Sequence, residues 1–426
     1  MHSNEGRRWG TSAKKSVPAQ PREIHSRLIR GSVTSPYRAA LFSPHVIYLL
    51  LLKTVITFFA MITEKTANMT CANRKFVSRL SDRRAKQTNP HVRPMHLLHD
   101  EPMSVIFSHA TAWAIYHAPN RPSVMPSFPA CPAPLGRSYP AKGDIACARS
   151  LLELCGIPTE SLKQLDVLVA DESLRSDDPK VVSHVCSREL PAGSVCRLAP
   201  GTFVVSPEIC FIQMGMIFED IRELVEFGFE LCGSYELDVV PDGDYRERPA
   251  LATCDSIAAI IDSMTGMRGV AVARKALRYV REGARSPMET AHIMTLVLPR
   301  CMGGAGISAV CMNHRIDIPF ELQGLTRRRS VICDGCIPER LLDFEYNGFW
   351  HDEEERRVED EDRRNVLEAM GYRVKVLNRF AFFNCFAFRR HLRSIFQILR
   401  IREEKLPNGF WARQEELRRF VLRRLL

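Results

Sequence analysis

The sequence predicts a mixed α/β fold, and three observations lead to that prediction. Residues 341–347 alternate between apolar and polar side chains directly after a turn signal at Pro338, which is typical of a strand in a β-hairpin. Residues 352–370 have an acidic first turn, basic residues later and Gly371 behind them, the pattern of a capped helix. Residues 372–377 then read as a strand again.

The chain divides into four predicted parts. Residues 1–102 form a basic segment without a core pattern and are expected to be largely unstructured. Residues 103–280 form a mixed α+β domain, residues 284–405 contain the elements described above, and residues 406–426 form a basic helix. The strands expected in the second part lie at 165–170, 181–186, 194–198 and 202–205, and its helices at 144–155, 207–217, 224–232, 254–264 and 270–280.

A long apolar run lies in the N-terminal part. Residues 46–62 are largely apolar but contain Lys53 at their middle, whereas a spanning helix needs about 20 residues without a central charge. Three interpretations stay open: a disordered tail translated upstream of the true start, a membrane anchor, or a folded helix. On the first interpretation, Met61, Met69, Met95 and Met103 are alternative starts. We expect no stable membrane association.

The composition permits nucleic-acid binding without requiring it. The chain has 59 basic and 49 acidic residues, a formal net charge of +10, and 45% hydrophobic residues, so it is not disordered throughout. Arginines are dense from residue 389 onward, where they form either a solvated helix face or contacts to a phosphate backbone.

The cysteines indicate a reducing compartment, and we expect the protein to be cytoplasmic. Fourteen cysteines are scattered without the framework of a small disulfide-rich domain. Cys333 and Cys336 form the one C-x-x-C pair in the sequence. The pair is interpreted as buried structural thiols, as metal ligands that lack a second pair, or as a redox pair.

Two acidic residues are predicted to face each other across the hairpin. If its turn is centred between Glu339 and Arg340, Asp334 pairs directly with Glu345. The Cβ atoms of such a pair lie roughly 5 Å apart, where like charges destabilise the sheet. A hard divalent cation such as Mg²⁺ between the carboxylates removes that repulsion, and a metal held in this way outlines a phosphodiesterase site.

A helix predicted over 286–298 precedes strands predicted at 314–319 and 330–336. It opens with Ser286-Pro287-Met288-Glu289, in which Ser286 and Glu289 form a capping box and the proline occupies the first helical position.

This order resembles the PD-(D/E)XK, or restriction-endonuclease-like, superfamily, and in particular the family of the very-short-patch-repair endonuclease. The motifs of that family run from an Asp through Glu-Tyr-Asp-Gly and a nearby His to D-x-x-R-x-x-x-L-x-x-x-G-[WY]-x-V. The residues that match are Asp334, Glu345-Tyr346-Asn347-Gly348, His351, Asp360, Arg363, Leu367, Gly371, Tyr372 and Val374. The region before them is similar, more distantly, to abortive-infection-type antitoxin proteins.

The resemblance implies a restriction-endonuclease-like α-β-β-β-α-β core, Mg²⁺ (or Mn²⁺) as cofactor and DNA as partner. Asp334 and Glu345 would hold the metal, Glu289 would be a third acid, and His351 would orient water or protonate a leaving group. Glu289 and His351 also have structural interpretations, as a capping-box residue and as a cap of the following helix. The chain departs from the superfamily at Asn347, which stands where the superfamily has its lysine, so catalytic competence stays open.

The candidate DNA contacts are Arg327, Arg328, Arg329, Arg363 and Lys375. The first three fall in one predicted loop, where the alternative is a solvated loop. Lys375 either replaces the missing lysine or is an exposed lysine of its strand.

The sequence thus predicts a Mg²⁺-dependent endonuclease that hydrolyses DNA phosphodiester bonds. The alternative is a non-catalytic DNA-binding or antitoxin-like regulator that keeps the nuclease fold. Asn347 favours the regulator, and the Asp334 and Glu345 pair favours the enzyme. A third interpretation is a membrane-tethered protein whose functional part is the N-terminal run. His184, in the second part, is expected to be a core histidine rather than a ligand.

Overall fold

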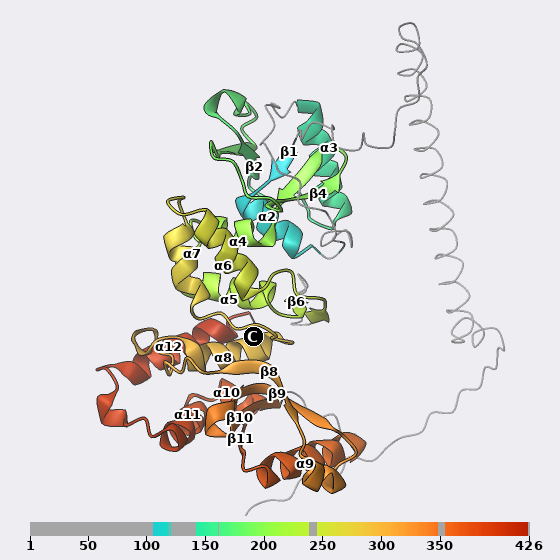
Figure 1. The fold of residues 1–426 in the computed structure, drawn as a ribbon. Helices are drawn as coiled ribbons and strands as arrows, with labels where there is room; N and C mark the ends of the chain where they lie inside the picture. The colour runs from blue at the N-terminus through green and yellow to red at the C-terminus, as the bar shows by residue number, and fades with distance from the viewer. Residues whose placement is uncertain are drawn as a thin grey trace, which may run out of the picture. The chain divides into compact units, whose positions relative to one another are not determined.

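The computed structural model describes residues 105–118, 120, 142–160, 162–237, 245–347 and 354–424. These residues form a mixed α/β protein with two larger sheets and a short hairpin (Figure 1), which confirms the predicted class. The N-terminal segment and its apolar run at 46–62 lie outside the described residues. Among the helices that are described, none has both the length and the apolar character needed to cross a membrane.

The first sheet has its strands in the order β3-β2-β1-β5-β4. β1 runs parallel to β5 and β2 parallel to β3, whereas the pairs β1–β2 and β4–β5 are antiparallel. The four strands predicted in this region are all present, and β1 joins them at the centre. The bounds are β1 (Val105–Phe107), β2 (Leu165–Val169), β3 (Val181–Val185), β4 (Val195–Ala199) and β5 (Thr202–Val205).

The helix predicted from residue 207 begins where its cap predicts, whereas the helices predicted from residues 144 and 224 begin earlier, at Lys142 and Ile221. Ser206 accepts a hydrogen bond from the backbone N–H of Ile209 at 3.4 Å, with Pro207 at the first helical position. A short hairpin of β6 (Tyr235–Leu237) and β7 (Tyr245–Glu247) was not predicted, because strands this short show too few alternations to recognise. The helices are α2 (His109–Tyr116), α3 (Lys142–Leu154), α4 (Pro207–Met214), α5 (Ile221–Leu231), α6 (Cys254–Ser263) and α7 (Val270–Leu277).

The second sheet follows the predicted order of helix, three strands, helix and strand. Its strands lie in the order β11-β10-β9-β8, with β8, β9 and β10 antiparallel and β11 parallel to β10. One face of the sheet packs on helix α8, which precedes its strands, and the other on helix α9, which connects β10 to β11. The bounds are α8 (Pro287–Val297), β8 (Cys311–Asp317), β9 (Ser330–Ile337), β10 (Leu342–Asn347), α9 (Glu354–Ala369) and β11 (Arg373–Asn378).

Two boundaries of this sheet differ from the prediction for identifiable reasons. β8 begins at Cys311 rather than at residue 314, because Cys311 and Met312 already pair with β9. β10 begins at Leu342, because Leu341 closes the turn with a left-handed backbone, φ 47°.

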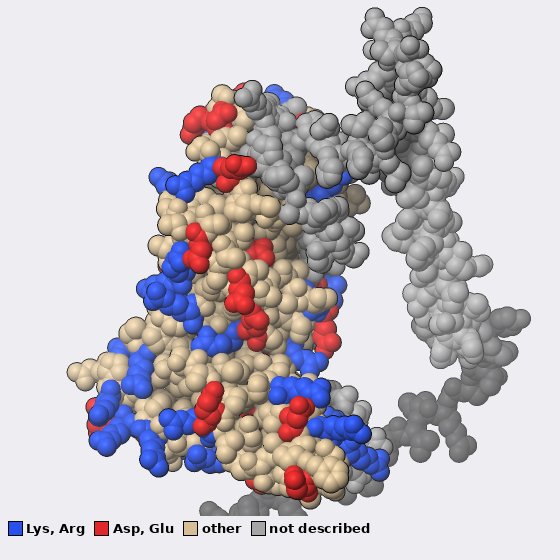
Figure 2. Space-filling model, in the orientation of Figure 1, with Lys and Arg blue, Asp and Glu red and all other residues tan. Residues whose placement is uncertain are grey.

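The C-terminal helices α10 (Arg379–Phe383), α11 (Cys385–Leu399) and α12 (Phe410–Leu422) complete the described chain. α12 packs on α8 and buries Phe410 and Leu417. Arg418 is also buried, and its guanidinium donates to the carbonyl oxygens of Phe382 and Phe383. The segment predicted as a basic helix therefore also contributes to the core. Figure 2 shows basic side chains gathered on the outer surface of the C-terminal helices.

Candidate functional site

The register of β9 and β10 is the predicted one. Asp343 pairs with Cys336 and Phe344 with Gly335, so the same register continued by one residue places Glu345 opposite Asp334. The backbone ladder ends before that pair. The Asp334 carboxylate instead accepts a hydrogen bond from the backbone N–H of Tyr346 at 2.9 Å. β9 and β10 therefore diverge at Asp334.

The alternation of β9 is broken at the same position. Cys333 and Cys336 both pack in the hydrophobic cluster on the α9 side of the sheet, although residues three apart on a regular strand point to opposite faces. The β8 residue between the two flanking pairs is Asn313, whose φ of 44° is left-handed. This shared irregularity of β8 and β9 brings Cys333 to the same side as the polar residues of β10.

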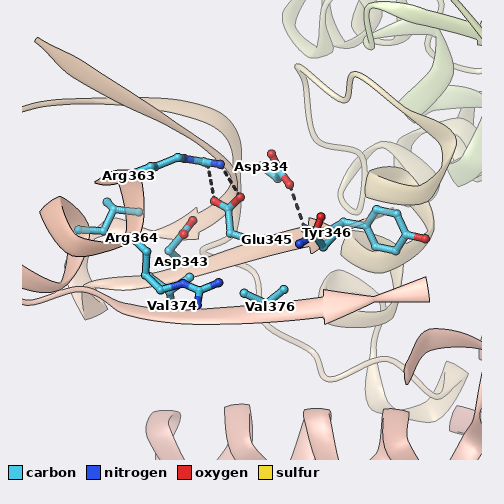
Figure 3. A pocket seen from close by; sticks show the side chains of 10 residues that line it. Asp334, Asp343, Glu345, Tyr346, Arg363, Arg364, Val374 and Val376 are labelled. Atoms are coloured by element: carbon cyan, nitrogen blue, oxygen red, sulfur yellow. Dashed lines mark hydrogen bonds and ion pairs between the residues drawn. The ribbon is translucent and has the colours of Figure 1, made fainter. Parts of the chain in front are cut away.

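A pocket of about 180 Å³ opens where the two strands diverge (Figure 3). Figure 3 shows carboxylates from β9 and β10 beside a guanidinium from α9, above strand β11. The residues that line it are Asp334, Asp343, Glu345, Tyr346, Asn347, Arg363, Arg364, Leu367, Val374 and Val376.

Glu345 is held by Arg363 through two parallel contacts. One guanidinium nitrogen donates to Oε2 at 2.7 Å and the other to Oε1 at 2.5 Å, and Arg363 also donates to the carbonyl oxygen of Ile332. The two side chains are 14% and 21% exposed. Arg363, which the sequence marks as a candidate DNA contact, thus engages an acid of the pocket in this structure.

Asp343 is a site residue that the sequence analysis missed. It is 0% exposed, and among the described residues neither of its carboxyl oxygens has a hydrogen-bond partner. Its position two residues before Glu345 places both side chains on one face of β10, a signal that alternation alone could have given. Burial raises the pKa of Asp343.

The three acids that line the pocket outnumber its two arginines, of which Arg363 contacts Glu345. Burial, followed by the nearby charges of Asp334 and Asp343, raises the pKa of Glu345 even though Arg363 favours its ionised form. A bidentate guanidinium stabilises one carboxylate strongly, but it cannot neutralise three. We therefore expect the cluster to bind either protons or a cation at neutral pH.

Glu289 takes part in the cap of α8 and also lies near Asp334. Its carboxylate accepts from Ser286 Oγ and from the backbone N–H of Arg285, each at 3.0 Å, while its own N–H donates to Ser286 Oγ at 3.2 Å. Burial and the charge of Asp334 raise the pKa of Glu289 to about 7. The predicted Ser286 cap is confirmed, but the Glu289 carboxylate accepts from the N–H of Arg285 instead of that of Ser286, so the reciprocal half of the capping box is missing. Its position beside Asp334 keeps the functional interpretation open.

A second cleft of about 560 Å³ adjoins Asp334 on the side of Glu289. Its lining residues are Tyr245, Glu247, Arg285, Glu289, Asn313, Thr326, Arg328, Ser330, Val331, Ile332, Asp334, Arg363 and Val366. Arg328 therefore lies beside the acids, and Arg327 and Arg329 are exposed in the same loop.

The structure describes the position of Lys375, one of the predicted site residues, but not that of His351. Lys375 pairs with Phe344 in the parallel ladder, between Val374 and Val376 of the pocket. Burial, and after it the charge of Lys375, lowers the pKa of His391 on α11 to about 4. The alternation of β11 places Lys375 on the opposite face from the pocket, so the structure does not bring it to the position of the missing lysine. His351 lies outside the described residues.

A second polar cluster lies in the first sheet. His184 Nε2 is 2.7 Å from the carboxylate of Asp166, and the ring of His109 stacks on that of His184 at 3.6 Å. His184 is thus satisfied, as expected, but its side chain is 25% exposed on the edge strand β3, so it is not a core residue. His109 has a left-handed φ of 47°, and burial together with the neighbouring His184 lowers its pKa to about 4.

Comparisons of the chain with protein-family models, with curated proteins and with solved structures find no match. Its class is therefore described from the fold and the site alone. It is a mixed α/β protein with a carboxylate-lined pocket where two strands of a four-stranded sheet diverge.

Proposed function

We propose that the chain is a metal-dependent endonuclease that hydrolyses DNA phosphodiester bonds with Mg²⁺ (or Mn²⁺) as cofactor. The observation that carries the proposal is the convergence of Asp334, Asp343 and Glu345 on one pocket. The element order α8-β8-β9-β10-α9-β11, with β11 parallel to β10, is the order expected of a restriction-endonuclease-like core and supports the proposal.

The residues of the pocket fit a divalent cation. Carboxylate oxygens are the ligands that Mg²⁺ and Mn²⁺ prefer, and the oxygens of Asp343 are buried without a hydrogen-bond partner among the described residues. Burial, and after it the charges of Asp334 and Asp343, raise the pKa of Glu345, and a cation would relieve the repulsion among these charges. Asp334 and Glu345 would hold the cation, with Asp343 behind them.

A divalent cation at this place supplies polarisation of a phosphoryl oxygen and a more acidic bound water. The residues around it have separate tasks. A guanidinium matches two phosphate oxygens, so Arg363 would bind the scissile phosphate once it has released Glu345 to the cation. Glu289, with a pKa of about 7, exchanges a proton readily at neutral pH. Arg328 would contact a flanking phosphate from the adjoining cleft.

The second candidate function is a non-catalytic DNA-binding or antitoxin-like regulator with the same fold. Asn347 favours it, because this residue lines the pocket at the position where the superfamily has its lysine. No lysine is among the described residues that line the pocket, and Lys375 lies on the other face. On this proposal, the exposed arginines of the loop and of the C-terminal helices would bind the DNA backbone.

A plasmid cleavage assay with the full chain separates the two functions. Supercoiled plasmid is incubated with the protein in Mg²⁺, in Mn²⁺ and in a chelator. The enzyme proposal predicts nicking with either metal, none with the chelator, and none with the Glu345→Gln variant. The matched control is Asp317→Asn, which removes an exposed acid of the same sheet that forms an ion pair with exposed Arg315.

The control variant should cut as the parent does. DNA binding without cleavage in any metal would refute the enzyme proposal and favour the regulator.

A further inference from the structure

We infer that Cys333, Asp343 and Glu345 form a binding site for a thiophilic divalent ion, such as Zn²⁺. The site shares Glu345 with the cation of the proposed function. It adds Cys333, which the sequence analysis considered as a metal ligand only together with Cys336, and Asp343, which the sequence analysis did not assign to a metal. The inference goes beyond the proposed function, because it requires neither DNA nor cleavage.

The three ligand atoms are already close together. Cys333 Sγ and one carboxylate oxygen from each of Asp343 and Glu345 lie within 4.8 Å of one another. Ligands bound to Zn²⁺ at about 2.0–2.3 Å in a tetrahedral site lie roughly 3.5 Å apart. Modest rotations of the three side chains therefore suffice to close the site.

The backbone places these residues for reasons that are local to each strand. Asp343 and Glu345 are two residues apart on β10 and share its face. Cys333 reaches the same side because the alternation of β9 is broken at Asp334. On a regular strand, Cys333 would point to the opposite face from the two carboxylates of β10.

The carboxylate oxygens of Asp343 and Glu345 also have lone pairs available to bind an ion. Asp343 is fully buried, and its carboxyl oxygens accept no hydrogen bond from an N–H or hydroxyl group of the described residues; its polar neighbours are Cys333 and Glu345. A buried polar group in this condition calls for an unobserved partner. Glu345 gives one lone pair of each oxygen to Arg363, and a carboxylate offers about four.

The donor set selects the kind of ion. A cysteine thiolate favours Zn²⁺ or Co²⁺, whereas Mg²⁺ binds oxygen ligands. Three protein ligands beside an open pocket leave a fourth position for water or a substrate oxygen, as in zinc sites that are not purely structural. The competing explanation is a proton shared between Asp343 and Glu345, with Cys333 a buried core thiol.

The test is a titration of Co²⁺ into the reduced, metal-free full chain, followed by the thiolate-to-Co²⁺ charge-transfer absorption. We expect one equivalent to give the absorption and Zn²⁺ to displace it. Cys333→Ser should abolish the absorption, and Asp343→Asn should weaken binding at least about tenfold, the loss typical even of an outer-shell partner. Cys301→Ser, which changes an exposed cysteine, should bind as the parent does.

An absorption that is missing in the parent, or kept in Cys333→Ser, would overturn the inference. Should Cys333→Ser fail to fold, Asp343→Asn decides, because it leaves the pair of Arg363 and Glu345 intact. Parent-like Co²⁺ affinity in that variant would also overturn the inference.

The cleavage assay keeps the two proposals apart. A chain that binds Co²⁺ through Cys333 but leaves plasmid uncut keeps this site and loses the proposed function. A chain that cuts with Mg²⁺ but lacks the absorption loses this site alone.

Discussion

Replacing Asp343 by asparagine should stabilise the metal-free protein. The substitution keeps the shape of a side chain that is 0% exposed and removes a carboxyl group that has no hydrogen-bond partner among the described residues. The new amide can donate to the Glu345 carboxylate, and a hydrogen bond to a charged group contributes about 1.5–3 kcal/mol. We therefore expect the free energy of unfolding to rise by about 1–3 kcal/mol in the presence of a chelator.

The assay is thermal unfolding of the full chain, in which each kcal/mol moves the midpoint by about 2–4 °C for a larger domain. Parent and variant are compared in a chelator and in excess Zn²⁺. A ligand that binds only the native state raises stability by RT ln(1 + [L]/Kd), so Zn²⁺ should raise the midpoint of the parent more than that of Asp343→Asn. Asp317→Asn, the exposed control, should change stability by less than about 0.5 kcal/mol. A variant less stable than the parent in chelator would refute the view that Asp343 is strained in the metal-free state.

Two further predictions concern other charged groups. Arg363→Gln should lower the free energy of unfolding of the metal-free protein. The loss should be smaller than the roughly 3–5 kcal/mol of a fully buried pair, because the pair with Glu345 is partly exposed. A divalent cation should restore part of the loss, and denaturant unfolding that finds the metal-free variant as stable as the parent would contradict this prediction. The folded pKa of His109, about 4, lies below its unfolded value of 6.5, so its neutral form contributes stability that is complete above pH 6.5 and is lost as the pH falls toward 4. His109→Asn, which tolerates the left-handed backbone, should reduce this acid sensitivity by up to about 3 kcal/mol, and urea unfolding at pH 7 and pH 4.5 measures the difference; an unchanged pH dependence would show that another group is responsible.

Local signals predicted the elements around the site well. The alternation of residues 341–347 and the turn at Pro338 together specify the register, which the pairing of Phe344 with Gly335 confirms. The start of α8 follows from Ser286 and its neighbouring proline, because capping is a property of consecutive residues. In each case the determining interactions lie within a few residues of sequence.

The arrangement inside the pocket depends on contacts between distant segments and could not be predicted in the same way. The break at Asp334 involves Asn313 on another strand, and it alone brings Cys333 to the acids. The contact of Arg363 with Glu345 depends on which face α9 turns toward the sheet, and that orientation is set by packing between distant segments. The face of Lys375 depends on the parallel register of β10 and β11, which no local pattern specifies.

The most direct test of the carboxylate pocket as a cation site is a calorimetric titration of Mn²⁺ into the metal-free full chain and into Glu345→Gln. Mn²⁺ accepts the same oxygen ligands as Mg²⁺. We predict saturable binding to the parent and binding at least about tenfold weaker to the variant, because Glu345 is common to every arrangement of ligands in the pocket. Equal binding to both proteins, or binding to neither, would contradict the account.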